Sequence, residues 1–97
     1  MNVNDRKSPL VWFAEIELDD EPYQFSIICV WRHGAELVYA QDSGCSCPSP
    51  FEDTQVEDLT TLTPGEWKNV KRIVKESRAP MDVKQSFINE VEEAMNV

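Results

Sequence analysis

The stretch LVWFAEIELDDEPYQFSIICVWRHGAELVYAQ, residues 10–41, decides the fold class of this chain. Apolar side chains alternate with other residues over about 10–18, 23–31 and 35–41, and a period of two is typical of strands with one buried face. The breaks at residues 19–22 and 32–34 carry turn-forming residues such as Pro22 and Gly34. The pattern predicts a three-stranded antiparallel meander.

The alternation also assigns a core face to each expected strand. The residues expected on it are Leu10, Trp12, Ala14, Ile16, Leu18, Tyr23, Phe25, Ile27, Cys29, Trp31, Ala35, Leu37 and Tyr39. The opposite face carries Val11, Phe13, Ile28, Val30 and Val38. That face is more apolar than a solvated sheet face usually is. Homodimerisation through it, or cover from residues 56–62, would explain its composition.

A loop and a short helix are expected to follow the sheet. Residues 42–53 include two prolines, a glycine and several small polar residues, so the sequence predicts neither helix nor strand there. Thr54 and Glu57 have the spacing of a capping box, which indicates the start of a short helical segment.

Two amphipathic helices are expected to complete the chain. The sequence TPGE, residues 63–66, supplies an N-cap threonine, a first-turn proline and a capping-box glutamate for a helix over about 64–78. Asp82 is expected to cap a last helix over about 82–95. The prediction is therefore an α+β fold with both helices packed on the sheet.

Size and composition indicate one domain. The chain has 97 residues, of which 41 % are apolar, enough for one core without disulfides or metal. We expect residues 1–9 to form a flexible arm and residues 10–97 to form the domain. No run approaches the roughly 18 apolar residues of a membrane span, and the first residues lack a secretory signal. No membrane association is therefore expected.

The charge limits the class of partner. The formal net charge is −9, which repels nucleic acid and favours a neutral or basic protein partner. A basic stripe on the first long helix is weak in this context and is interpreted as a solvated face; it comprises Lys68, Lys71, Arg72 and Lys75. An alternative is that the acidic residues imitate nucleic acid and occupy a nucleic-acid-binding protein. Those residues are Glu15, Glu17, Asp19, Asp20, Glu21, Glu52, Asp53, Glu57 and Asp58.

The most distinctive motif is DSGCSCPSPFE, residues 42–52, which places two thiols and two prolines close together. Residues 39–52 and the following 57–59 resemble an uncharacterised family of small proteins encoded by actinobacteriophages, which carry an Asp-Ser-Gly-Cys-Ser-Cys-Pro loop after a short meander. The resemblance covers about half of the chain. It implies a phage protein in the host bacterial cytoplasm and supplies no catalytic residues.

The thiols allow several interpretations. Cys29, His33, Cys45 and Cys47 match the number of ligands of structural zinc. However, His33 at the hairpin turn is expected to lie roughly 20 Å from Cys45 and Cys47, given about 3.3 Å per strand residue. Zinc or thiol chemistry at Cys45 and Cys47, assisted by carboxylates or a second subunit, stays an alternative. The favoured interpretation is that both thiols fill space under a rigid loop, and no cofactor is expected.

These observations predict a non-enzymatic phage accessory protein that binds a host or phage macromolecule. Rigid loops often carry binding sites, so the candidate surface is the Cys/Pro loop, defined as residues 42–51. The residues assigned to this candidate site are Asp42, Ser43, Gly44, Cys45, Ser46, Cys47, Pro48, Pro50 and Phe51.

Overall fold

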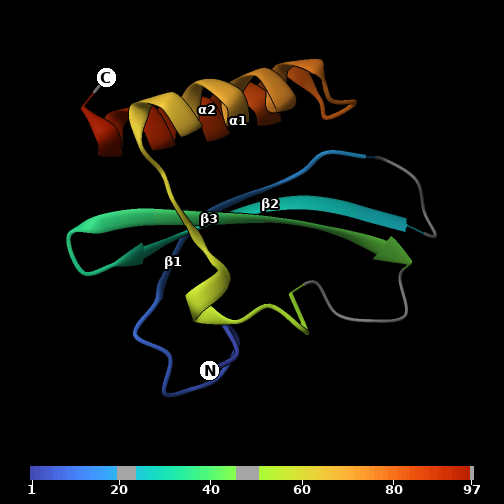
Figure 1. Cartoon of the computed structure of the whole chain (residues 1–97). Coiled ribbons are helices and arrows are strands. Elements are labelled where there is room, and N and C mark those ends of the chain that lie inside the picture. The colour runs from blue at the N-terminus through green and yellow to red at the C-terminus, as the bar shows by residue number, and fades with distance from the viewer. Residues whose placement is uncertain (20–23, 46–50, 97) are drawn as a thin grey trace.

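The computed structural model of the chain describes residues 1–19, 24–45 and 51–96, and only the backbone of Cys45. The elements are β1 (Val11–Glu17), β2 (Gln24–His33), β3 (Glu36–Cys45), the 3-10 helix η1 (Val56–Asp58), β4 (Thr60–Thr61), α1 (Pro64–Glu76) and α2 (Met81–Met95). Both α-helices cover one face of the sheet, and the N-terminal segment lies on the other (Figure 1). The predicted α+β class is confirmed.

The sheet has four strands in the order β1-β2-β3-β4, so the expectation of three strands was incomplete. Neighbouring strands are antiparallel, and β4 pairs with the first half of β3 through Val38 with Thr61 and Tyr39 with Thr60. Two threonines have high strand propensity but are too few to show a period, which is why the sequence pattern did not predict β4.

Strand β3 continues beyond the expected end at residue 41. Cys45 pairs with Gln24, and Gly44 pairs with Phe25, so residues 42–45 belong to the sheet and the prediction of a loop there was wrong. Asp, Ser and Gly have low strand propensity, but β2 is ten residues long and offers a ladder to every one of them. The partner strand outweighs the local preference.

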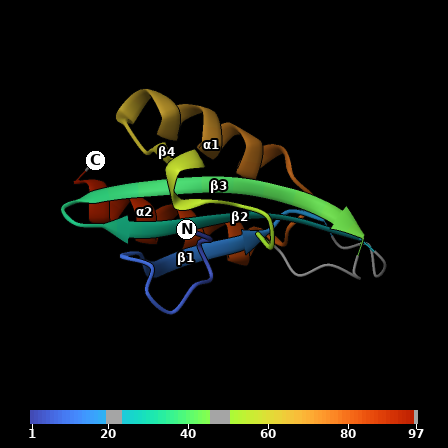
Figure 2. The same cartoon turned by 60° about the horizontal axis from the view of Figure 1, so that its bottom comes forward.

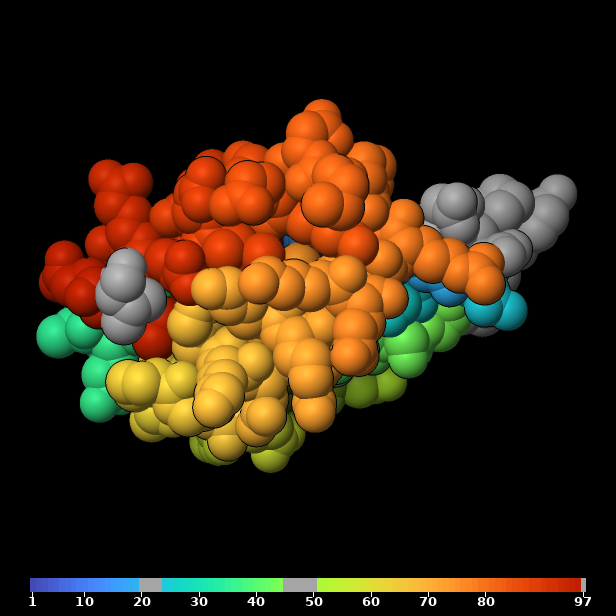
Figure 3. Space-filling view, turned by 90° about the horizontal axis from the view of Figure 1, so that it is seen from above, coloured from blue at the N-terminus to red at the C-terminus, as the bar shows by residue number. Residues whose placement is uncertain are grey.

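The main core lies between the sheet and the helices, and it reverses the face predicted for β2. Ile28 and Val30 are fully buried toward the helices, whereas Ile27, Cys29 and Trp31 are buried on the other side. The sheet and helix residues that enclose the main core include Ala14, Ile16, Leu18, Leu37, Trp67, Val70, Val74, Phe87, Ile88 and Val91. Seen from above, α1 and α2 lie side by side over it (Figure 3).

An irregularity in β1 changes which face of the sheet the side chains before it occupy. Trp12 pairs with Trp31, but Ala14 pairs with Val30, so the register shifts at Phe13. An extra residue in one strand changes the phase of the alternation. Trp12 therefore does not share a face with Ala14 and is 57 % exposed, which corrects the expectation that it belongs to the core.

A second, smaller core covers the face of the sheet opposite the helices. Its buried members are Val3, Ile27, Cys29, Trp31, Val38 and Phe51. The segment after the Cys/Pro loop contributes Val56 and Leu59. Cover from residues 56–62 was expected over the face of Ile28 and Val30, but the helices cover those residues and Leu62 enters the main core with them. Figure 2 shows this segment and the N-terminal segment in front of the sheet.

The first residues of the chain have defined partners in the second core. The backbone N–H of Val3 donates to the Thr54 carbonyl at 3.0 Å, and Val3 is only 6 % exposed. The flexibility of residues 1–9 stays a prediction, and these contacts argue against it for the first residues.

The helix starts were predicted with different success. Thr63 caps α1, accepting from the Glu66 N–H at 3.2 Å, as expected, but the Glu66 carboxylate accepts from the Tyr39 hydroxyl at 2.7 Å instead of reaching back. Residue 80 rather than Asp82 occupies the N-cap of α2. The segment expected to be a short helix has a single 3-10 turn with Gln55 at its N-cap, and no side chain caps it.

Candidate functional site

Strand β1 forms an edge of the sheet, and no strand pairs with its outer side in the described part of the chain. The N–H of Leu18 donates to the Ser26 carbonyl at 2.6 Å, so this residue turns its backbone toward β2. In an antiparallel pair the alternate residues turn the other way. Glu15 and Glu17 therefore direct their backbone N–H and C=O groups outward, where they form an open edge.

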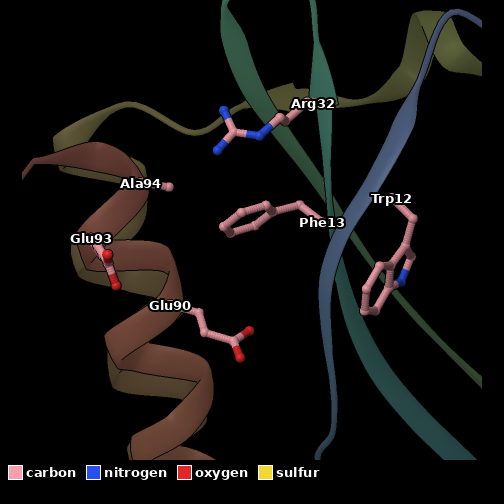
Figure 4. A pocket seen from close by; sticks show the side chains of 6 residues that line it. All are labelled: Trp12, Phe13, Arg32, Glu90, Glu93 and Ala94. Carbon is pink, nitrogen blue, oxygen red and sulfur yellow. The ribbon is translucent and has the colours of Figure 1, made fainter.

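A hollow of about 640 Å³ lies between this edge and α2. Figure 4 shows the Phe13 ring extending from β1 toward α2, with Arg32 of β2 beside it and Glu90 extending from the helix. The Arg32 guanidinium carbon is 4.8 Å from the centroid of the Phe13 ring, a cation–π contact. Trp12, Glu93 and Ala94 complete the lining.

A second hollow of about 350 Å³ continues along the same side of the molecule. It shares Trp12 and Glu90 with the first hollow, and its other lining residues are Ala14, Glu15, Asp82, Val83, Ser86 and Phe87. We call the two together the β1–α2 groove. Its α2 wall runs from residue 82 to residue 94, roughly 18 Å at about 1.5 Å per helical residue.

Exposed apolar side chains gather at this groove. Among the described residues, five large apolar side chains are exposed, and two of them, Trp12 and Val83, line the groove. Val11 directly precedes Trp12 in β1, and Met81 is the first residue of α2. The Trp12 indole N–H donates to the Glu15 carboxylate at 3.1 Å, which ties the exposed ring to its own strand. An exposed tryptophan held in place is a typical anchor for a protein partner.

The rim of the groove is acidic. Carboxylates reach it from both walls: Glu15 from β1, and Asp82, Glu90 and Glu93 from α2. Among the described residues that line the two hollows, Arg32 alone carries a positive charge, and it is already placed over Phe13. The groove thus combines aromatic surface, an open backbone edge and excess negative charge.

Residues 2–96 match the family described as a domain of unknown function, DUF7574. The chain belongs to this family. No curated protein and no solved structure matches the chain, and the DUF7574 description assigns no activity. The expectation of an uncharacterised family is confirmed. In the part of this DUF7574 chain that the structure describes, no helix is long and apolar enough to cross a membrane.

The structure separates the cysteines and the histidine that a zinc site would need. Cys29 is buried, and burial is the main cause that raises the pKa of its thiol to about 12, with a smaller contribution from the charge of Glu15. His33 pairs with Glu36 at one end of the β2–β3 hairpin and Cys45 with Gln24 at the other. Nine residues along β2 span roughly 30 Å, so one ion cannot bind both ends.

A zinc site at Cys45 and Cys47 stays a prediction, because the Cys45 side chain and residue 47 lie outside the described residues. Within the described residues, no group of three or more His, Cys, Asp or Glu side chains is placed to hold a metal.

The Cys/Pro loop of this DUF7574 protein is described only at its ends. Asp42 accepts a hydrogen bond from the Phe51 N–H at 2.7 Å and thereby joins the two ends. The Phe51 ring is buried and packs edge-on against Trp31, with centroids 5.2 Å apart. Phe51 is thus an internal anchor that a partner cannot reach without rearrangement. Ser43 and Gly44 lie in β3, and residues 46–50 lie outside the described residues.

The basic stripe on α1 is partly used inside the molecule. Lys71 forms a salt bridge with Glu92 of α2 at 2.7 Å, and the Trp67 indole donates to the same carboxylate at 3.1 Å. These two hydrogen bonds lower the pKa of Glu92. Lys68, Arg72 and Lys75 are exposed, as expected of a solvated face. The Lys71–Glu92 salt bridge thus joins α1 to α2.

The β1–α2 groove was not predicted from the sequence. One signal was present: Val11, Trp12 and Phe13 are three consecutive large apolar residues at the start of an alternating strand. They cannot all face one core, so at least one of them had to be exposed or partnered. Nothing in the sequence indicated that Glu90 and Glu93 of α2 would lie opposite them.

Proposed function

We propose that this DUF7574 protein is a non-enzymatic, phage-encoded accessory protein that binds a host or phage protein through the β1–α2 groove. The observation that carries the proposal is Trp12, a large side chain that is 57 % exposed and hydrogen-bonded in place at an open sheet edge. Tryptophan is enriched among residues that dominate binding energy. The phage origin and the host cytoplasm as the place of action rest on the resemblance of residues 39–52.

The chemistry of the groove supports binding. The described residues of its lining provide carboxylates, one guanidinium and the hydroxyl of Ser86, but no imidazole or thiol. Those two groups are the commonest general bases and nucleophiles near neutral pH. Aromatic rings and an open backbone edge, by contrast, are features of peptide-recognition surfaces.

The groove replaces the Cys/Pro loop as the preferred surface. Phe51, one end of the loop, is 5 % exposed, so its ring stabilises the fold and offers little area to a partner. The rest of the loop is a second candidate binding surface, to be tested alongside the groove.

Partner capture with matched variants tests the proposal. C-terminally tagged wild type, Trp12→Ala and Arg72→Ala are used to recover proteins from an actinobacterial host lysate with and without phage infection. The Arg72 side chain is exposed, so we expect the unfolding free energy of Arg72→Ala to lie within about 0.5 kcal/mol of wild type. Trp12→Ala loses the covered part of the indole and its hydrogen bond to Glu15, so a thermal melt first establishes that this variant is folded. The expected result is a partner recovered by wild type and Arg72→Ala but not by Trp12→Ala.

Equal recovery by Trp12→Ala would overturn the groove as the binding surface. A third variant, Cys45→Ser with Cys47→Ser, identifies the alternative. If that variant loses the partner while Trp12→Ala keeps it, the Cys/Pro loop is the binding surface.

A further inference from the structure

We infer that the groove takes an extended segment rich in lysine or arginine, which adds to the sheet as a new strand beside β1. The inference rests on the proposed function, that the groove binds protein, and specifies the chemistry of the partner. It depends on three features of the groove: the open backbone edge, the hollows above it and the charge of the rim.

The geometry fits an added strand. A new strand lies about 4.8 Å from its neighbour, and its side chains point alternately to the two faces of the sheet. Glu15 and Glu17 turn their backbone groups outward and so offer two donors and two acceptors to it. Because α2 lies over this side of the sheet, every second side chain of the added strand enters the hollows of about 640 and 350 Å³.

The charge selects a basic segment. A lysine or arginine side chain entering the hollow meets the carboxylates of Glu90 and Glu93 on α2 and the Phe13 ring on β1. Arg32 already shows how a cation is accommodated, since its guanidinium lies over the Phe13 ring. The Trp12 ring lies on the other side of β1 from Phe13 (Figure 4), so it offers a ring, of the kind that binds cations best, to the side chains that the added strand places on the opposite face. The net charge of −9 adds long-range attraction for such a segment.

The same residues disfavour a second copy of this chain. Pairing of two β1 edges would bring Glu15 and Glu17 of both copies close together, and like charges across adjacent strands are destabilising. Charged residues and bulges are common devices against such pairing, and β1 has both. A segment of opposite charge is attracted where a second copy is repelled, so these residues give specificity as well as protection.

A pair of synthetic peptides tests the charge requirement. Both have ten residues, blocked ends and a fluorescent label; one alternates lysine with valine and the other glutamate with valine. We expect the lysine peptide to bind in anisotropy titrations and the glutamate peptide to bind at least tenfold more weakly. Trp12→Ala should lower the affinity for the lysine peptide about tenfold or more, whereas Arg72→Ala should leave it unchanged. Glu90→Gln with Glu93→Gln should lower both the affinity and its salt dependence.

Backbone methylation tests the strand. Lysine peptides N-methylated at every lysine, or at every valine, each lose the N–H groups that point to one side. We expect one pattern to weaken binding at least tenfold and the other to be tolerated. Equal affinity of both patterns and the parent peptide would overturn strand addition.

The two hypotheses can fail separately. If the lysine peptide does not bind, but capture of a natural partner still requires Trp12, the inference is wrong and the proposed function stands. If neither depends on Trp12, both are wrong. Self-association that Trp12→Ala abolishes would identify a second copy as the occupant and would also overturn the inference.

Discussion

Replacing Asn2 tests whether the N-terminal segment is part of the fold. Its amide nitrogen lies 3.4, 2.6 and 3.0 Å from the carbonyl oxygens of Phe51, Glu52 and Thr54, and its Oδ1 accepts from the Asn4 N–H at 2.8 Å. An amide nitrogen has two hydrogens, so it makes two of the three bonds at full strength. At about 1 kcal/mol each, Asn2→Ala should lower the free energy of unfolding by about 2 kcal/mol.

Asn2→Asp is the sharper variant because it keeps the shape and removes the donor. The new carboxylate oxygen faces three carbonyl oxygens, and a polar group left without a partner costs a further ~1–3 kcal/mol. Each kcal/mol shifts the melting temperature of a domain of this size by about 4–8 °C. Asn2→Asp should therefore melt roughly 10 °C or more below wild type, and at a lower temperature than Asn2→Ala.

Thermal and urea unfolding, followed by circular dichroism and tryptophan fluorescence, measure this difference on protein tagged at the C-terminus. The gap between the two variants should narrow as the pH falls toward about 4, because the surrounding carbonyl oxygens favour the protonated carboxyl, which donates again. If Asn2→Asp were as stable as wild type at pH 7, the hydrogen bonds of Asn2 would not stabilise the fold, and the N-terminal segment would contribute nothing to the cover of the second core.

Three further predictions concern side chains inside the fold. With the other two thiols replaced by serine, Cys29, whose pKa is about 12, should react with a thiol reagent at pH 8 only as fast as the protein unfolds; fast labelling of folded protein would contradict its burial. Tyr39→Phe removes the hydroxyl that donates to Glu66 at 2.7 Å and should lower the unfolding free energy by about 1 kcal/mol; an unchanged urea midpoint would show that this bond adds no stability. Hydrogen bonds from Lys71 and Trp67 of α1 lower the pKa of Glu92 in the folded protein. Glu92 therefore contributes to folding stability above the ordinary glutamate pKa, and this contribution is lost as the pH falls through the lower pKa of the folded state. Glu92→Gln should therefore shift the urea midpoint more at pH 7 than at pH 3, and an equal shift at both would contradict this coupling.

Strands β1 to β3 and both α-helices could be predicted from the sequence, but the short strand β4 and the buried face of β2 could not. Residues 27–31 are all buried, because the helices cover one side and the N-terminal segment, Phe51 and the segment after it cover the other. When both faces of a strand are apolar, the alternation of residues does not show which face packs against the main core. Separately, the extra residue Phe13 in β1 moved Trp12 to the face opposite Ala14.

The candidate site depends on tertiary placement that local patterns do not encode. The cap at Thr63 was predictable because its donor is three residues away. The groove, in contrast, brings Trp12 near Glu90, residues that no period relates. That β1 is an edge strand follows from the order of the whole sheet. The Cys/Pro loop was predicted as the binding surface because of its unusual composition, although the buried Phe51 at its end shows that part of it is structural.

Backbone amide mapping by NMR tests most directly whether the β1–α2 groove is the binding surface. The ¹⁵N-labelled protein is titrated with the lysine–valine peptide or with the partner recovered by capture. Binding in the groove should concentrate the chemical-shift changes in Val11–Glu17 and Met81–Met95 and protect the Glu15 and Glu17 amides from hydrogen exchange. Changes concentrated at the ends of the Cys/Pro loop or on the exposed face of α1, with β1 unaffected, would contradict it.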